Sequence, residues 1–293
     1  MINKLLTFIV VIELMVVLLF NPVYRSNKKY KYSINTYKNS NVDQAKLENY
    51  VIGVVAAEMP ATFSLEALKA QAVAARTFAY KKITNNKLSF DNLINDKGQA
   101  YITTDKMKAN WGNKYDEYYK KISDAVLLTK GEILTYNGEI INAYYFSISN
   151  GKTEDSSKVF GETEYLLSVD SSWDTTYPSY YASISIPLEE FKNKVNINND
   201  IQIKEVKRTN SDHVEYIVIN DKKIDGVSFR KLLNLRSTDF YINIEGSNVN
   251  ISTKGYGHGV GMSQYGAKSL ADNGKSYEEI LKYYYQGVKI SKI

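Results

Sequence analysis

One glutamate stands where a helical stretch meets a proline. The segment "VIGVVAAEMP" is apolar up to Glu58, and Pro60 follows two positions later. On a helical wheel this glutamate falls in the stripe formed by Leu47, Val51 and Val54, so its carboxyl starts on the buried side. Burial and the negative end of the helix dipole both raise the pKa of a carboxyl group. The position therefore favours a neutral acid, the form that a general acid needs at neutral pH.

Two structural interpretations of Glu58 remain open beside the catalytic one. The glutamate could form a structural ion pair, for example with Arg76 of the next helix. Alternatively, its side chain could turn toward water in a frayed last turn. The spacing alone does not separate these alternatives from an acid placed for chemistry.

A second candidate site is the glycine-rich segment "KGYGHGVGMSQYGA" near the C-terminus, in which glycines recur at alternate positions. Alternate glycines suit backbone with positive φ and close approach of the chain to a ligand. The dinucleotide-binding fingerprint fails here, because its third glycine is replaced by Val260 or Met262, depending on the starting glycine. A P-loop is also excluded, since no Gly-Lys-Ser/Thr follows.

The chain has only two histidines, and one of them, His258, lies in this glycine-rich segment. It could donate a hydrogen bond to a substrate oxygen or orient another side chain, with a purely structural role as the alternative. The other, His213, lies in a strand that we expect to be exposed, and we assign it no role. The sequence shows neither clustered metal ligands nor a serine nucleophile elbow.

The composition excludes several other classes of function. The chain has no cysteine, so disulfides, thiol nucleophiles and cysteine zinc sites are ruled out. Its formal net charge is +5 without a block of Lys or Arg, so no nucleic-acid partner is expected. The 25 tyrosines supply flat rings with polar tips, which suit half-buried grooves and sugar faces, although composition bias explains them equally well.

The N-terminal segment is nearly all apolar. Residues 2–23 are long enough for a transmembrane helix and no small-x-small cleavage site follows, so we expect an uncleaved anchor over 1–23. Glu13 lies near its middle, where a charge is costly, and we expect it to be protonated or paired with another helix. Basic residues follow the span, so the positive-inside rule alone would keep the rest of the chain in the cytoplasm. Residues 24–42 are polar and predict a juxtamembrane linker.

Helical periodicity predicts three helices in the first half of the remaining chain. They cover residues 43–59, the stretch that follows a capping Ser64, and residues 115–129. A loop-rich excursion is expected between the second and third helices. The segment "GEILTYNGEIINAYYFSIS" predicts a β-hairpin with its turn at Asn137-Gly138.

Short strands dominate the second half. Residues 180–253 alternate strand-like runs with turns and contain one short helix, "SFRKLLNL". After the glycine-rich loop we expect a helix, a break at Asn273-Gly274, a second helix and a final strand. Helices and mainly antiparallel strands mix without a βαβ rhythm. We therefore predict an α+β fold, with a helical core carrying the glutamate, in one domain over 43–293.

Two long motifs resemble the stage II sporulation protein D (SpoIID) family of peptidoglycan lytic transglycosylases. They are "VIGVVAAEMPATFSLEALKAQAVAARTFAY" and "GYGHGVGMSQYGAKSLADNGKSYEEILKYYY". The intermediate pieces "FSISNGKTEDSSKVFG", "EYLLSVDSSWD" and "FRKLLNLRST" agree with the same family, so the similarity covers roughly residues 43–290. An N-terminal membrane anchor also fits the family.

The resemblance implies roles for individual residues. Glu58 would be the catalytic acid and base, and Arg76 would be a groove residue that supports it or the substrate. Four residues of the glycine-rich motif would line the same site: His258, Ser263, Gln264 and Tyr265. Some relatives bind zinc with Cys and His near the stretch equivalent to "FSISNGKTE". This chain has Ser147, Ser149 and Asn150 there, so we expect no metal and no cofactor.

The implied chemistry needs only one carboxylic acid. Glu58 would protonate the leaving glycosidic oxygen, and its conjugate base would take the proton of the C6 hydroxyl of muramic acid, leaving a 1,6-anhydro end. Donors from the glycine-rich loop could hold the muramyl group or stabilise developing charge. The alternatives are a non-catalytic glycan-binding or scaffold module and a muramidase that uses water. The muramidase would need a second carboxylate, for which the candidates are Asp155, Asp170 and Asp174.

Peptidoglycan lies outside the cytoplasmic membrane, so the resemblance implies an extracytoplasmic catalytic domain, against the charge count around the span. For a role in sporulation, the location would be the mother-cell membrane, facing the engulfed forespore. The expected partners are glycan strands of peptidoglycan, a cell-wall amidase that strips peptides, and a second membrane protein of the engulfment complex. Glu13 could contribute to such a membrane contact.

Overall fold

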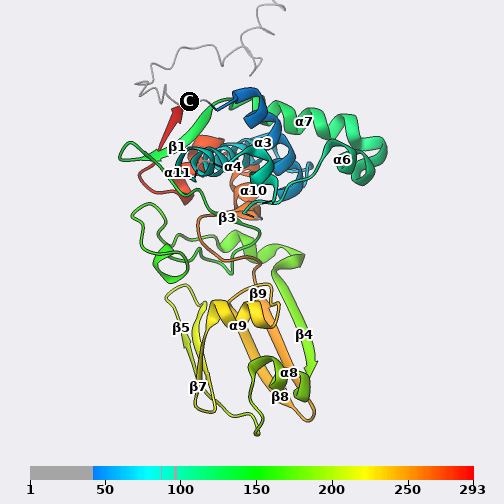
Figure 1. The fold of residues 1–293 in the computed structure, drawn as a ribbon, viewed down its shortest axis with the longest axis vertical. Coiled ribbons are helices and arrows are strands. Elements are labelled where there is room, and N and C mark those ends of the chain that lie inside the picture. The colour runs from blue at the N-terminus through cyan, green and yellow to red at the C-terminus, as the bar shows by residue number, and fades with distance from the viewer. Residues whose placement is uncertain (1–41, 87, 96–97) are drawn as a thin grey trace, which may run out of the picture. The chain divides into compact units, whose positions relative to one another are not determined.

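Two packed helices carry the segment that ends at Glu58. The computed structural model describes residues 42–86, 88–95 and 98–293. Helix α3 (Gln44–Glu58) begins after Asp43, whose side chain accepts a hydrogen bond from the Lys46 N–H at 3.1 Å. Helix α4 (Leu65–Asn86) follows the turn after the proline and packs along α3 (Figure 1). Both helices therefore lie where the periodicity of apolar residues predicts them.

The expected N-terminal cap of α4 is wrong in its detail. The Ser64 Oγ is buried without a hydrogen-bond partner among the described residues, so the side chain does not cap the helix. Instead, the Ser64 carbonyl accepts the first intrahelical bond, from the Leu68 N–H at 3.1 Å. Small side chains on α4 are fully buried and allow close contact with its neighbours; they include Ala67, Ala70, Ala74 and Ala75.

The stretch after α4, expected to be loop-rich, contains two short helices. They are α5 (Phe90–Asn95) and α6 (Thr104–Trp111), the second capped by the Thr103 hydroxyl. Helices this short leave little periodicity to read, which is why the sequence alone does not reveal them. Helix α7 (Tyr115–Leu128) then packs against both α3 and α4, and it confirms the third predicted helix.

A small antiparallel sheet joins the two ends of the helical region. Strand β1 (Glu132–Tyr136) lies between β2 (Glu139–Ile140) and the C-terminal strand β11 (Lys289–Lys292). The β1–β2 turn has φ of 50° at Asn137 and 87° at Gly138, as the predicted type I′ turn requires. Two helices near the C-terminus, α10 (Gln264–Asp272) and α11 (Tyr277–Tyr284), pack on α4 (Figure 1). One hydrophobic core runs through all of these elements.

A two-residue parallel pairing connects the segment after the hairpin with the glycine-rich motif. Strand β3 (Tyr145–Phe146) pairs with β10 (Met262–Ser263), with Tyr145 opposite Met262. The other strand pairs of the described residues are antiparallel. This short pairing places the start of α10 next to the segment that follows the β1–β2 hairpin.

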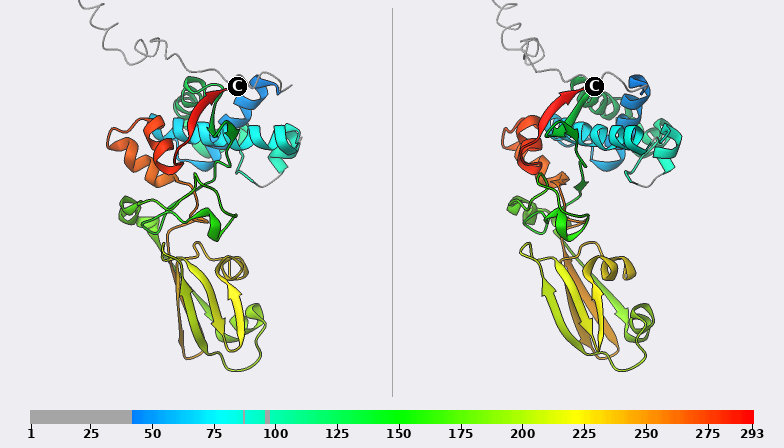
Figure 2. Two further views of the ribbon diagram at one scale, coloured as in Figure 1. Left: turned by 90° about the vertical axis from the view of Figure 1, so that its left-hand side faces the viewer. Right: turned by 60° about the vertical axis from the view of Figure 1, so that its left-hand side comes forward.

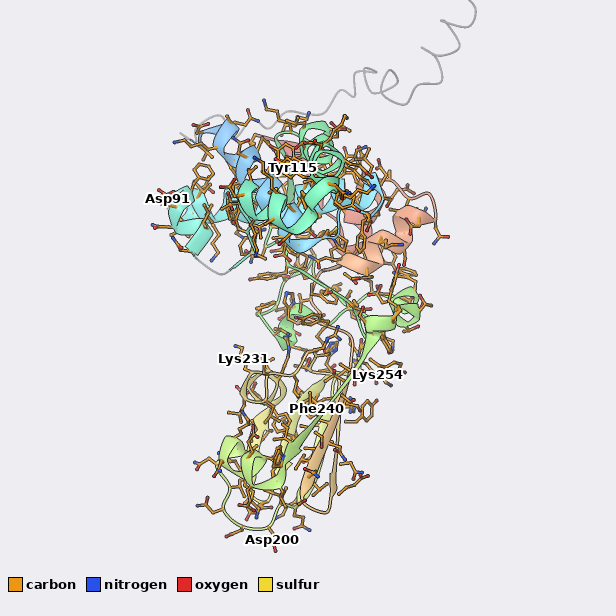
Figure 3. All side chains as sticks on the ribbon, turned by 90° about the vertical axis from the view of Figure 1, so that its right-hand side faces the viewer. Asp91, Tyr115, Asp200, Lys231, Phe240 and Lys254 are labelled. Atoms are coloured by element: carbon orange, nitrogen blue, oxygen red, sulfur yellow. The ribbon has the colours of Figure 1, made fainter. Side chains whose placement is uncertain are left out.

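The β-rich segment forms two three-stranded sheets with a hydrophobic core of their own (Figure 2). One sheet has the order β4–β9–β8 and the other β5–β6–β7. Its elements are β4 (Tyr181–Pro187), α8 (Leu188–Val195), β5 (Ile203–Arg208), β6 (Val214–Ile219), β7 (Lys222–Asp225), α9 (Gly226–Leu232), β8 (Phe240–Glu245) and β9 (Asn248–Lys254). Helix α9 was predicted and α8 was not. Phe240, labelled in Figure 3, is fully buried and stacks on Phe229 with ring centroids 4.8 Å apart.

The mixture of helices with mainly antiparallel strands agrees with the predicted α+β class. The described residues all belong to one compact unit. None of the helices described is long and apolar enough to span a membrane. The anchor predicted for residues 1–23, the linker predicted for 24–42 and Glu13 lie outside the described residues, apart from Val42.

Candidate active site

The Glu58 carboxylate lies at the last residue of α3, half-buried, and accepts hydrogen bonds from separate parts of the chain. Its Oε1 accepts from the Ala100 N–H at 2.7 Å, and its Oε2 accepts from the Gln264 Nε2 at 3.2 Å. The Tyr145 side chain lies near the same carboxylate and lowers its pKa. Glu58 thus accepts from two donors, neither of which carries a charge.

Burial is the largest influence on the protonation of Glu58. It raises the pKa of the carboxyl, while the hydrogen bonds from Ala100 and Gln264 and the nearby Tyr145 side chain act in the opposite direction, and the net result is a raised pKa. Burial disfavours the charged form because the carboxylate loses its hydration. The direction of the shift is the one expected from the sequence, and it favours an acid that can donate a proton near neutral pH.

Gln264 reaches Glu58 because the start of α10 is firmly placed. Ser263 caps this helix, with its Oγ accepting from the Gly266 N–H at 3.1 Å. The same hydroxyl lies 2.5 Å from Oδ2 of Asp174, which is fully buried and also accepts from the Ser149 N–H at 2.7 Å. Burial raises the pKa of Asp174 to about 6, although these hydrogen bonds lower it. The Ser263 side chain is fully buried, so it fixes the start of α10 and does not line an open groove.

The glycine-rich loop adopts the positive φ angles that its alternating glycines suggest. The close approach, however, is to the protein's own backbone. Gly261 has φ of +81°, and a Cβ there would lie 2.1 Å from the Tyr144 carbonyl oxygen. Similarly, a Cβ on Gly257 would lie 2.6 Å from the Phe146 Cβ. The glycines therefore let the loop pack tightly on the segment around β3, which carries Tyr145 toward Glu58.

His258 packs into an aromatic cluster beside this segment. Its ring lies 5.0 Å from that of Phe160 and 6.1 Å from that of Tyr144, measured between centroids. Its Nδ1 accepts from the Val260 N–H at 3.1 Å. Burial lowers the pKa of His258 to about 4, so the ring is neutral at pH 7. In this structure His258 braces the loop against β3, and a contact with substrate stays a prediction.

The structure places Arg76 in the core, and the expectation that it lines a groove does not hold. Its side chain is 0% exposed and forms a bidentate ion pair with Glu48, with Nη2 2.6 Å from Oε2. Its Nη2 also donates to the Val126 carbonyl, and its Nη1 donates to the Glu132 carbonyl. The alternative of an ion pair between Arg76 and Glu58 is also not realised, because the guanidinium is committed to Glu48.

His213 and Tyr265 are both engaged in packing within the protein. His213 was expected in an exposed strand, but it is only 4% exposed and lies just before β6, against the glycine-rich loop at Gly259. Burial and nearby Arg208 lower the pKa of His213 to about 4. Tyr265 is half-buried between the rings of Phe63 and Tyr177, so it packs α10 onto its neighbours.

The candidate second carboxylates are engaged in local structure. Asp155 caps a short helical turn through the Ser157 N–H at 2.8 Å, and Asp170 accepts from the Ser172 hydroxyl at 3.0 Å. Asp174 is the buried partner of the α10 cap described above. Within the described part of the chain, no cluster of three or more His, Cys, Asp or Glu side chains could hold a metal ion. The absence of a metal in the functional protein stays a prediction.

Comparison with known proteins places these features in a family. The family model described as "Stage II sporulation protein" (SpoIID) matches residues 35–136, which include Glu58. The chain is 44% identical to stage II sporulation protein D of Bacillus amyloliquefaciens over 89% of this chain and 79% of the relative. Its identity to the Bacillus subtilis protein of the same name is 43%, with the same coverage. The chain belongs to the stage II sporulation protein D family.

A more distant relative of this SpoIID-family chain is named "Amidase enhancer" and comes from Bacillus subtilis. It is 33% identical over 82% of this chain but only 40% of the relative. Within the SpoIID fold, the two long motifs of the sequence meet at one carboxylate: the first supplies Glu58 and the second supplies Gln264. Sequence reasoning missed Ala100 and Tyr145, because a backbone N–H and a lone tyrosine give no recognisable pattern.

Proposed function

We propose that this chain is a peptidoglycan lytic transglycosylase that acts in sporulation, with Glu58 as its catalytic acid and base. The observation that carries the proposal is the environment of the Glu58 carboxyl. It is half-buried, its pKa is raised by burial, and the residues that the structure describes donate to it from uncharged groups, the Ala100 N–H and the Gln264 amide. The membership of the SpoIID family supports a role in sporulation and in the cell wall.

In the proposed reaction, protonated Glu58 donates its proton to the oxygen of the bond between MurNAc and GlcNAc as that bond breaks. The carboxylate that remains then takes the proton of the muramyl C6 hydroxyl, and the oxygen of that hydroxyl bonds to C1. The product carries a 1,6-anhydro ring, the proton returns to Glu58, and no water is consumed. The tethered hydroxyl has a high effective concentration, so a single carboxyl suffices. Raising the pH through the raised pKa of Glu58 should therefore lower the rate.

The test is digestion of peptide-free glycan strands by the purified, detergent-solubilised chain, followed by mass spectrometry of the ends. We expect anhydromuramyl ends, and we expect them to disappear with Glu58→Gln. Reducing ends would instead support a muramidase that uses water. Unchanged cleavage by Glu58→Gln would overturn the assignment of the acid.

A second candidate function is stimulation of a cell-wall amidase. Such an amidase, which strips peptides from the glycan, is one of the partners expected from the sequence. The relative named "Amidase enhancer" favours it. The two functions separate in one experiment, in which amidase turnover is measured with wild type and with Glu58→Gln. Equal stimulation by both would assign a scaffold role that is independent of cleavage.

The proposed location is a membrane, with the catalytic domain outside the cytoplasm and facing the forespore. The basis is the substrate, since peptidoglycan lies on that side, together with the apolar N-terminal segment. A second membrane protein of the engulfment complex would be the partner of the anchor. Protease protection of residues 43–293 in intact and permeabilised cells tests the orientation.

A further inference from the structure

Two arginines in the described part of the chain have no acidic partner. The arginines of that part are Arg76, Arg208, Arg230 and Arg236. Arg76 is paired with Glu48. Nη1 of Arg208 lies 2.9 Å from Oδ1 of the buried Asp239. Arg230 and Arg236 are half-buried, yet neither forms an ion pair with any described residue. A half-buried cation without a carboxylate is costly, so this pair is a candidate site for an anion.

The Arg236 guanidinium lies on an exposed tyrosine ring. Its central carbon is 4.4 Å from the ring centroid of Tyr256, which is 47% exposed. Nη2 donates to the Ser179 carbonyl at 2.9 Å. The other two nitrogens donate to none of the described residues, and one of them, Nε, is buried. The stacking holds the guanidinium in place while leaving part of its hydrogen-bonding capacity unused.

Arg230 is tied to the same stretch of backbone. Its Nε donates to the Leu235 carbonyl at 3.2 Å, and the Leu235 N–H donates back to the Arg230 carbonyl at 2.8 Å. Its two terminal nitrogens have no acceptor among the residues that the structure describes. Burial lowers the pKa of Arg230, as expected for a cation that loses water without gaining a carboxylate.

The glycine-rich loop lies directly against these arginines. The Gly257 N–H donates to the Arg236 carbonyl at 2.9 Å. Tyr256 exchanges two backbone hydrogen bonds, of 2.7 and 3.0 Å, with Ile148 just after β3. The same loop continues to Gln264, the residue that donates to Glu58. The unpaired arginines are therefore fixed to the motif that also supplies the candidate active site.

A carboxylate next to a sugar ring fits these groups. A guanidinium binds a carboxylate through two parallel hydrogen bonds, and a tyrosine ring suits the flat face of a sugar. In the proposed substrate, each muramic acid carries a lactyl group. Its carboxyl is ionised when the peptide has been removed and is an uncharged amide when the peptide is attached. Two uncompensated cations favour the ionised form.

We propose that Arg230 and Arg236, together with the ring of Tyr256, form a subsite for the lactyl carboxylate of a peptide-free muramyl residue. The proposal rests on the proposed function for the identity of the glycan. Its physical content, the binding of a carboxylate by two arginines, can be measured without any cleavage.

The experiment measures glycan binding by titration calorimetry, with the detergent-solubilised full chain carrying Glu58→Gln so that the glycan stays intact. The two probes are peptide-free glycan strands and the same strands with their carboxylates converted to methylamides. Amidation should weaken binding about 10–100-fold, the effect of losing hydrogen bonds to a charged group. Adding Arg230→Gln and Arg236→Gln should weaken binding of the unmodified strands by the same factor and leave the amidated strands unaffected. Equal affinity for both probes, or a preference that survives both substitutions, would overturn the proposal.

The matched control is Lys231→Gln, which removes an exposed cation of α9 beside Arg230 (Figure 3). It should leave the preference for the carboxylate unchanged. A loss as large as that of the arginine substitutions would mean that only net charge matters, and it would reject the subsite. If the double variant does not fold, Arg230→Gln alone decides, and it should remove part of the preference.

A phosphate group could reach the same guanidiniums, so poly(glycerol phosphate) is a third probe. Tighter arginine-dependent binding of this polymer than of peptide-free glycan would overturn the assignment to a carboxylate. The failure of the proposed function looks different. A wild type that binds peptide-free glycan with the expected preference but releases no anhydromuramyl ends would reject the proposed function and support the subsite.

Discussion

Helix α3 carries two glutamates that are buried in opposite ways. Glu48 is 5% exposed and shares a bidentate ion pair with Arg76, whose remaining donors go to backbone carbonyls. Glu58 is half-buried and accepts from a backbone N–H and a side-chain amide of the described residues. The Arg76 cation compensates the charge of the first carboxylate, whereas the described part of the chain forms no ion pair with the second.

This difference separates a structural carboxylate from a candidate catalytic one. A buried charge is tolerated when a partner of opposite charge and good geometry accompanies it. A half-buried carboxyl with neutral donors can instead take up a proton at modest cost, because its pKa is raised. The residue expected to assist Glu58, Arg76, serves the other glutamate.

The largest effect is expected at the candidate catalytic carboxyl. Glu58→Gln should lower glycan cleavage by about 10²–10⁴-fold, because an amide donates no proton to the leaving oxygen. The unfolding midpoint in urea should change little, since an amide oxygen still accepts from Ala100. The exposed Glu139→Gln is the control and should cleave like wild type. If Glu58→Gln and Glu139→Gln cleaved glycan equally well, Glu58 would have no catalytic role that sets it apart from a structural carboxylate such as Glu48.

The structural ion pair should control stability. Arg76→Leu leaves the Glu48 carboxylate buried without its cation, which should cost about 3–5 kcal/mol of unfolding free energy. Urea denaturation measures the loss. Adding Glu48→Gln to Arg76→Leu should recover part of it, because the uncompensated charge disappears. A small loss for the single variant would mean that the pair contributes little to the fold.

The buried Asp174 should make stability depend on pH. Its pKa of about 6 in the folded state exceeds the ordinary value of 3.8, so the folded chain holds the proton more tightly than the unfolded chain. Stability from this group is therefore greatest at low pH and falls as pH rises from about 4 to 6, by about 3 kcal/mol at most.

Asp174→Asn mimics the protonated side chain and should remove that fall. The measurement is urea unfolding of both chains at pH 4 and pH 7, with the difference between them as the readout. If the stability of the wild type and of the variant depended on pH in the same way, the pKa of the Asp174 carboxyl would not be raised in the folded chain.

The smallest expected effect concerns the glycine-rich loop. Gly261→Ala places a methyl 2.1 Å from the Tyr144 carbonyl oxygen at a φ of +81°. Gly274→Ala is its matched control, with a φ of +85° and open space around the added carbon. Both lose stability through the strained backbone, and the close contact should cost Gly261→Ala about 1–3 kcal/mol more. If the two variants lost the same amount of stability in thermal unfolding, the loop would be able to shift and relieve this contact.

The sequence predicts the long elements well and the contacts of the site only in part. Helices α3 and α4 and the turn at Asn137 follow from periodicity and turn chemistry, which are local. The bond between Glu58 and Gln264 joins positions far apart in the chain, and the resemblance of both motifs to one family anticipated their meeting. The ion pair between Arg76 and Glu48 was not predicted. An arginine that lines a groove and an arginine that is buried in the core can occupy the same face of α4, so the sequence does not separate them. The supporting contacts of Ala100, Tyr145 and Asp174 depend on tertiary packing that no local pattern encodes.

The measurement that tests the central claim most directly is cleavage of glycan strands in oxygen-18-labelled water. A single carboxyl that activates the muramyl C6 hydroxyl consumes no water, so we expect anhydromuramyl products that carry no label. Products with labelled reducing ends would contradict the account, because they would require a water molecule and a second group to activate it.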